Sequence, residues 1–155
     1  GCTLRLANVF GRSQKGQKQD RGILDKIFSR AIEKQDIIIF GDGEYIRDYI
    51  FIDDIVSAFL RSSEYNEKTN GLTFYIGSGE GISLKNAFQK VVDLAAKVTG
   101  RQVNCEHIEP PKGLSNIEFR NAIIDSTSFT KATGWKPKYS FDSGLNTAYQ
   151  SYLSE

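Results

Sequence analysis

The sequence has 155 residues, a length that suits one domain with a buried core. It contains 20 Lys and Arg and 19 Asp and Glu, which gives a net charge of +1. Charges of both signs are interspersed and no apolar run reaches membrane-spanning length, so we expect neither a nucleic-acid-binding surface nor a membrane protein. Cys2 and Cys105 lack metal-ligand spacing and fit free thiols of a cytoplasmic protein, although a disulfide stays open, and a single histidine, His107, argues against a His-based triad or metal site.

The chain opens with "TLRLANVFG" (residues 3–11), a strand-like run of Leu and Val without a polar lead-in. A buried strand at the very start needs neighbours from elsewhere, so we expect it to come from a longer protein. A polar loop follows over 12–22. Residues 36–40 predict a short strand, and "GDGE" (41–44) predicts a turn. Between the loop and that strand, residues 23–34 predict a helix, because apolar residues recur at helical spacing: Ile23, Leu24, Ile27, Phe28 and Ala31.

The rest of the chain alternates between the two kinds of element. Strands are predicted over 47–52, 71–78 and 102–108, with a short extended segment over 120–125. Helices are predicted over 55–65, 84–98, 127–133 and from about 142 to 152. Side chains that can accept from free amides precede three of these helices: Asp53 or Asp54, Ser83, and Asp125 or Ser126. This order predicts an α/β fold with short parallel elements.

Two glycine clusters invite a search for a phosphate loop. Gly41-Asp42-Gly43 and Gly77-Ser78-Gly79-Glu80-Gly81 each follow a predicted strand. The dinucleotide fingerprint needs a third glycine three residues after the second, but Ile46 and Ile82 stand there. Neither cluster ends in the Gly-Lys-Ser/Thr of a P-loop. We therefore interpret both clusters as turns, in which glycine adopts a positive φ without strain.

Arg47, at the head of an otherwise apolar strand, has two interpretations. It can pair on the surface with Asp48, Glu44 or Asp53, which stabilises a protein by about 1 kcal/mol at most. It can also serve as a bidentate clamp for an anion, because a rigid strand and a tight turn fix its position. The pattern alone leaves both open. We assign Asp48 and Asp54 structural roles, as helix caps and as partners of nearby cations.

Four stretches in order, "LRLANVFG", "GDGEYIRDYIFIDDIVSAF", "FYIGSGEGISL" and "TGWKPKYSFDSGL", resemble the C-terminal part of the NAD-dependent epimerases and dehydratases that act on nucleotide sugars. These enzymes are extended short-chain dehydrogenases. The resemblance covers nearly the whole chain and implies an α/β fold, with one late Rossmann strand and a small mixed α/β substrate-binding domain. The domain boundaries that it implies are 1–12 for the strand of the truncated Rossmann domain and 13–155 for the nucleotide-sugar-binding domain.

The resemblance also implies which residues meet the nucleotide sugar. Asn8 matches an asparagine that approaches the substrate from the cofactor side, and Arg47 matches the arginine that holds the diphosphate. The 37–40 stretch, with Ile39 and Phe40, matches an edge whose backbone meets the base. Glu118 falls where the family often places an acid on the ribose hydroxyls.

One position departs from the family pattern. Many members carry a second diphosphate-binding arginine three residues before that acid, and Ser115 stands there in this chain. Arg120 or Lys112 can supply the missing charge. We prefer Arg120, because a guanidinium is the better fork for a phosphate, although it can equally be an exposed cation at the end of a strand.

The chemistry of the family is hydride transfer between the sugar and NAD or NADP, and it needs a Tyr-x-x-x-Lys pair. No tyrosine of this chain has a lysine four residues later, so we expect no catalytic residue here, and the cofactor fingerprint is also absent. The chain should therefore hold a nucleoside-diphosphate sugar for a longer epimerase or dehydratase and be inactive alone. Family members commonly form homodimers. The alternatives are a free-standing nucleotide-sugar or phosphate-binding module without catalysis, and a purely structural or interaction domain.

Overall fold

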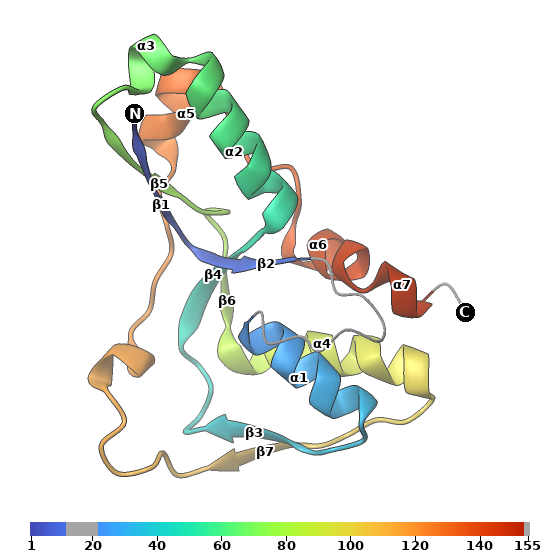
Figure 1. The fold of residues 1–155 in the computed structure, drawn as a ribbon. Coiled ribbons are helices and arrows are strands. Elements are labelled where there is room, and N and C mark those ends of the chain that lie inside the picture. The colour runs from blue at the N-terminus through green and yellow to red at the C-terminus, as the bar shows by residue number, and fades with distance from the viewer. Residues whose placement is uncertain (12–21, 154–155) are drawn as a thin grey trace.

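A computed structural model describes residues 1–11 and 22–153 (Figure 1). The strands are β1 (Thr3–Leu6), β2 (Asn8–Phe10), β3 (Ile37–Phe40), β4 (Ile46–Phe51), β5 (Thr73–Ile76), β6 (Gly81–Ser83) and β7 (Cys105–Ile108). The helices are α1 (Ile23–Ile32), α2 (Ile52–Glu64), α3 (Asn66–Thr69), α4 (Leu84–Thr99), α5 (Thr127–Thr133), α6 (Phe141–Ala148), α7 (Gln150–Leu153) and a 3-10 helix, η1 (Asn116–Phe119). The predicted α/β class and the parallel pairing are confirmed.

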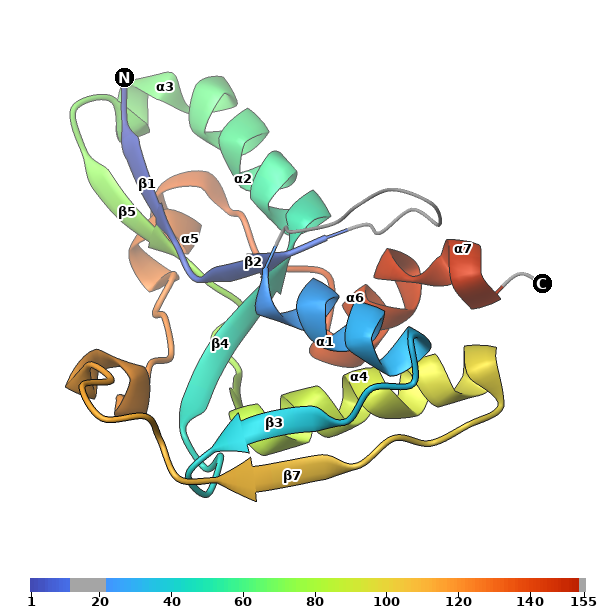
Figure 2. The same ribbon diagram turned by 60° about the horizontal axis from the view of Figure 1, so that its bottom comes forward.

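Strand β4 lies at the centre of the arrangement (Figure 2). It pairs in parallel with β2 and antiparallel with β6 in a three-stranded sheet. On one side of it lie the parallel pair β1–β5 and helices α2, α3 and α5. On the other side lie the parallel pair β3–β7 and helices α1 and α4 (Figures 1 and 2). Because β4 joins the two groups, its side chains meet both.

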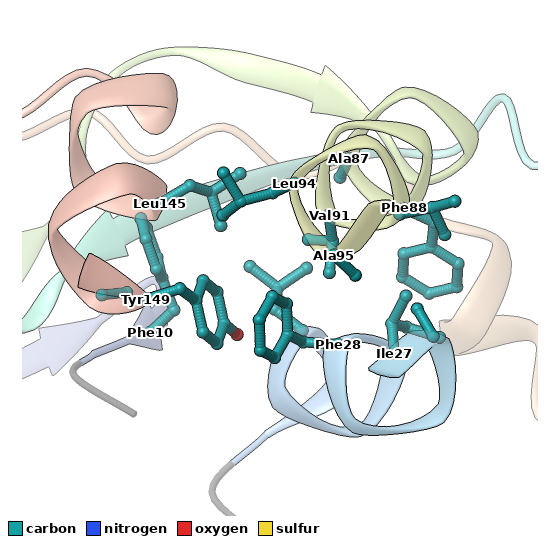
Figure 3. Close-up of a cluster of buried hydrophobic side chains, with 14 of the residues drawn as sticks. Phe10, Ile27, Phe28, Ala87, Phe88, Val91, Leu94, Ala95, Leu145 and Tyr149 are labelled. Carbon is teal, nitrogen blue, oxygen red and sulfur yellow. The ribbon is translucent and has the colours of Figure 1, made fainter. Parts of the chain in front are cut away.

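Two clusters of buried apolar side chains match these two groups. The larger core cluster packs α1 against α4 and α6, and Phe28 stacks on Tyr149 there with ring centroids 3.9 Å apart (Figure 3). The smaller core cluster lies under α2 and α5 and consists of Ile50, Ile55, Ala58, Phe74, Ile76, Phe129 and Trp135. These clusters account for the helical spacing of apolar residues in α1 and α4, which face each other.

Several local expectations were wrong in detail. The single strand expected over 3–11 divides at Ala7, because β1 pairs with β5 whereas β2 pairs with β4. Helix α2 begins at Ile52, before both aspartates that were expected to cap it, and its N-cap residue makes no side-chain hydrogen bond. In contrast, Ser83 does cap α4 and accepts from the Asn86 amide. Strand β6 was not anticipated.

The loop expected over 12–22 and the domain boundary between residues 12 and 13 fall almost wholly outside the described residues. Both core clusters draw on segments from either side of that boundary. The larger one contains Phe10, and Leu4 and Val9 pack against the smaller one. The first strands are therefore integrated with the rest of the chain.

Candidate functional site: a cleft along β4

Four of the six residues expected to bind a ligand, Asn8, Phe40, Arg47 and Glu118, line one cleft with a volume of about 400 Å³. Asn8, Arg47 and Glu118 supply its charged and amide groups. Its remaining lining is largely apolar and includes Ile38, Phe40, Tyr45, Phe88, Leu114 and Phe119. A mostly apolar cleft with a few convergent polar groups is the usual form of a small-molecule site.

Arg47 anchors one wall of this cleft. Its Nη2 donates to the carbonyl of Glu118 at 2.6 Å, and its Nη1 donates to the carbonyls of Arg120 and, at 3.0 Å, of Ile46. A guanidinium carries five N–H groups, so these three contacts leave two N–H groups for another acceptor. Arg47 thus holds the chain around Glu118 while its charge faces the cleft.

Two of the three acids considered as surface partners of Arg47 make different contacts. Glu44 pairs with Lys85. The carboxylate of Asp48 is 1% exposed and turned toward the backbone of distant segments. The contacts of Arg47 are therefore to carbonyl groups, which leave its positive charge without a carboxylate among the contacts described.

Asp48 makes the densest set of hydrogen bonds near the site. Its Oδ1 accepts from the amide of Ser78 at 3.0 Å and from the hydroxyl of Ser78 at 2.6 Å. Its Oδ2 accepts from the amides of Gly79 at 3.1 Å and Ile124 at 3.0 Å. Asp48 was expected to cap a helix or to pair with a cation, but its partners are instead the amides of three residues outside the helices and one hydroxyl.

Asn8 is exposed on β2 and lines the cleft. Its Nδ2 donates to the backbone carbonyl of Asp48 at 3.0 Å. This bond fixes the amide group and leaves its Oδ1 available as an acceptor. The neighbouring pair Arg47 and Asp48 therefore positions both Asn8 and the segment that carries Glu118.

The remaining site residues expected from the sequence lie at different depths. Phe40 is 40% exposed and lines the cleft, whereas the side chain of Ile39 is 1% exposed and belongs to the larger core cluster. Arg120 is exposed and gives its carbonyl to Arg47, and its side chain is not part of the cleft lining. Ser115, where the family often has an arginine, caps η1 by accepting from the Ile117 amide.

Tyr49 shares the cleft with Arg47 and is 5% exposed. Burial raises the pKa of its hydroxyl to about 12, and the nearby charge of Arg47 acts in the opposite direction. A neutral hydroxyl at physiological pH is therefore built into the floor of the site.

The first glycine cluster forms the predicted turn, whereas the second is a connection with a bend at Gly79 whose last residue, Gly81, begins β6. Gly41 and Gly43 have φ values of 70° and 68° in the connection from β3 to β4, and Gly79 has a φ of 75°. The amides of Ser78 and Gly79, which a phosphate would need, already donate to the Asp48 carboxylate. A negative charge occupies the place of the anion, so this loop fits neither a phosphate nor the pyrophosphate of a dinucleotide.

The described part of the chain offers neither a cluster of metal-ligating side chains nor a helix suited to cross a membrane. Within residues 1–11 and 22–153, no group of three or more His, Cys, Asp or Glu side chains is arranged to hold a metal ion. Over the same ranges, none of the helices has the length and apolar character that a membrane span requires.

Pattern reasoning missed two features of the cleft. Tyr45 and Phe119, from distant parts of the chain, meet edge to face with ring centroids 5.1 Å apart and form part of the cleft wall. The aromatic residue in "GEYIRD" was the available signal. The second missed feature is Asp48, whose burial no local pattern reveals.

Comparison with known proteins finds relatives over nearly the whole chain. Residues 1–77 match the model of the NAD dependent epimerase/dehydratase family. The chain is 30% identical to low-salt glycan biosynthesis protein Agl12 of Haloferax volcanii, over 97% of the chain and 44% of that protein. It is 31% identical to dTDP-L-rhamnose 4-epimerase of Burkholderia thailandensis, over 92% of the chain and 37% of that protein.

Solved structures extend the comparison. A UDP-glucose 4-epimerase from Thermotoga maritima, solved with UDP-glucose, superposes with a TM-score of 0.77 at 32% identity, over 97% of this chain and 45% of that one. An epimerase from Methanothermobacter thermautotrophicus shares the fold with a TM-score of 0.80 at 21% identity, over 97% and 42%. The chain thus spans less than half the length of the relatives that it matches.

The fold is that of the extended short-chain dehydrogenases. The chain belongs to the NAD-dependent epimerase/dehydratase family, whose members include nucleotide-sugar enzymes such as UDP-glucose 4-epimerase.

Proposed function

We propose that this chain is the substrate-binding portion of an NAD(P)-dependent nucleotide-sugar epimerase or dehydratase and holds the nucleoside diphosphate of the sugar donor. The observation that carries the proposal is the position of the Arg47 guanidinium, in one cleft with Asn8 and Glu118. A rigid strand fixes the arginine, and two of its N–H groups lie outside the contacts described. A pyrophosphate oxygen can accept both, which is the strongest kind of hydrogen bond available to a protein.

The other residues divide the remaining ligand among them. Asn8 can accept from or donate to the sugar or phosphate, and the Glu118 carboxylate can accept from two neighbouring ribose hydroxyls. The backbone of Ile39 and Phe40 would meet the base at the apolar end of the cleft. Arg120, which is exposed, would turn toward the phosphates to supply the second positive charge.

The chain's own residues bind and orient the substrate. When bound, NAD or NADP accepts and returns a hydride. Neither glycine cluster of this chain has the dinucleotide fingerprint, and the amides of Ser78 and Gly79 in the second cluster already donate to Asp48. We therefore assign the cofactor and the catalytic acid–base pair to other residues of a longer protein, and propose that the chain alone is inactive. The division into 1–12 and 13–155, a cytoplasmic location and a homodimeric whole protein belong to the same proposal.

Calorimetry with UDP, dTDP, CDP and GDP tests the proposal in the whole natural protein that contains these residues. We expect one nucleotide to bind, Arg47→Lys to bind it about tenfold more weakly and Arg47→Ala more weakly still, because an ammonium cannot form the bidentate contact. Arg61→Ala is the matched control, since Arg61 pairs with Glu64 on α2, away from the cleft. If no nucleoside diphosphate binds, the proposal is wrong.

The second candidate is a free-standing nucleotide-sugar or phosphate-binding module. It is favoured by one observation, that the sequence combines the cleft with no Tyr-x-x-x-Lys pair. Turnover assays on the whole natural protein with NAD(P) and nucleotide sugars separate the two candidates. Binding together with interconversion of the sugar supports the enzyme, whereas binding without any turnover supports the module.

A further inference from the structure

Residues 118–124 form a segment with little regular structure of its own, which runs from η1 toward α5 (Figure 1). The backbone of Ile46 in β4 is hydrogen-bonded to the middle of this segment. The amide of Ile46 donates to Asn121 Oδ1 at 2.8 Å, and the carbonyl of Ile46 accepts from the Ala122 amide at 3.0 Å. The next two residues of β4 hold its ends, since Arg47 binds the carbonyls of Glu118 and Arg120, and Asp48 binds the amide of Ile124.

Asp48 is the residue through which most of these parts are joined. Its carboxylate connects the 118–124 segment to the Ser78–Gly79 connection, and its carbonyl holds Asn8. The packing leaves room for this arrangement only because residue 77 is a glycine. A Cβ atom at Gly77 would lie 2.5 Å from Asp48 Oδ2 and 2.5 Å from Ile124 Cβ.

We propose that Asp48 is a positioning residue of the substrate cleft, whose carboxylate fixes the 118–124 segment and the Ser78–Gly79 connection relative to Arg47. The inference rests on the proposed function, since it concerns the same cleft. Asp48 does not line that cleft and acts through the groups that it holds. Misplacement of binding groups by about 1 Å can weaken their action strongly, so a residue behind the site can control affinity.

The chain offers a matched control. Asp54 is also 1% exposed and also accepts from backbone amides, those of Lys138 at 2.8 Å and Tyr139 at 3.1 Å. These partners lie in the connection between α5 and α6, and none of them lines the cleft. Asp48→Asn and Asp54→Asn therefore remove the same kind of buried acceptor, with and without a connection to the site.

The experiment compares these variants in the whole natural protein, by calorimetry with the nucleoside diphosphate that the wild type binds and by hydrogen exchange of single amides. For Asp48→Asn we expect affinity to fall about tenfold or more and the amides of Gly79 and Ile124 to exchange faster. For Asp54→Asn we expect lower stability with unchanged affinity of the folded protein. Ser78→Ala removes the hydroxyl contact to Asp48, together with the two contacts between that hydroxyl and the Glu80 backbone, and keeps both amides. It should weaken binding a few-fold and remains informative if Asp48→Asn does not fold.

The outcomes separate the two proposals. If the wild type binds no nucleoside diphosphate, the proposed function is wrong and the role of Asp48 falls with it. If the wild type binds and both Asp48→Asn and Ser78→Ala bind equally well, the positioning role alone is wrong. Equal losses of affinity in the Asp48 and Asp54 variants would also overturn the positioning role. The loss would then come from destabilisation of the whole fold and not from the connection between Asp48 and the cleft.

Discussion

Gly144, in the middle of α6, gives a prediction in which two opposing effects can be weighed. An alanine there would favour the helix by about 1 kcal/mol, because glycine is the poorer helix former. Its Cβ, however, would lie 2.7 Å from Phe10 Cζ and 3.3 Å from Phe51 Cβ. Carbon atoms pack at about 3.5–4.0 Å, so something has to move.

The ring of Phe10 has little freedom to do so. It is 8% exposed and lies between the rings of Phe51 and Phe141, with centroid distances of 5.5 Å and 5.6 Å. Extra atoms in such a core cost about 1–3 kcal/mol. We therefore expect Gly144→Ala to lower the free energy of unfolding by about 1 kcal/mol after the helix gain is subtracted.

Urea denaturation followed by circular dichroism measures this difference. Asn146→Ala on the same helix is the control, because Asn146 is exposed and its replacement should stabilise the protein by about 0.5 kcal/mol. If Gly144→Ala proved as stable as Asn146→Ala, the close packing of Gly144 in α6 against Phe10 would be refuted.

Three further predictions concern buried aromatic residues. The pKa of Tyr49 is raised from its ordinary value of 10.0 to about 12, so its contribution to the free energy of unfolding is complete below pH 10 and is lost between pH 10 and about 12. In that window the stability of Tyr49→Phe should fall less steeply than that of the wild type, as measured by denaturant titration at each pH. An equal slope for the two proteins would contradict the burial of Tyr49. Phe28→Ala should lower the free energy of unfolding by about 3–5 kcal/mol, since Phe28 is 2% exposed and stacks on Tyr149. A loss below about 1 kcal/mol would contradict this expectation, because it would mean that the surrounding side chains fill the cavity. Trp135→Phe should cost about 1–3 kcal/mol, because the bond from Nε1 to Ser57 Oγ at 2.8 Å is lost; a double-mutant cycle with Ser57→Ala that shows no coupling would rule this bond out as the cause.

The sequence predicted the regular elements well where the repeating pattern of apolar residues extends over many positions. The helix expected over 84–98 is observed as Leu84–Thr99, with the expected serine cap at its start and Gly100 in the left-handed conformation at its end. Strand β6 escaped prediction because three residues beginning with glycine carry no strand period, and its pairing with β4 decides its conformation. Tertiary contacts, which no local window contains, fixed that element.

The residues of the candidate site also differ in how far the sequence alone could identify them. Arg47 could be selected from its unusual place in an apolar strand, but the resemblance to the family was needed to connect it with Asn8 and Glu118. Asp48 looked like one half of a surface ion pair because it stands beside an arginine. Its actual partners, Ser78 and Ile124, are 30 and 76 positions away, so burial and pairing arise only when the chain is folded.

The alternation of side chains along β4 explains how one short strand can serve two tasks. Tyr49 and Phe51 enter the larger core cluster, on the side where Arg47 reaches the cleft, whereas Ile50 enters the smaller one. Asp48 shares the parity of Ile50 and meets the connection that follows β5. A shift of register by one residue would exchange the two faces and place the carboxylate in the cleft and the guanidinium in the interior. Burial of the two apolar clusters determines which face of β4 points toward the cleft. The clusters therefore determine that the cleft presents the positive charge of Arg47 and not the negative charge of Asp48.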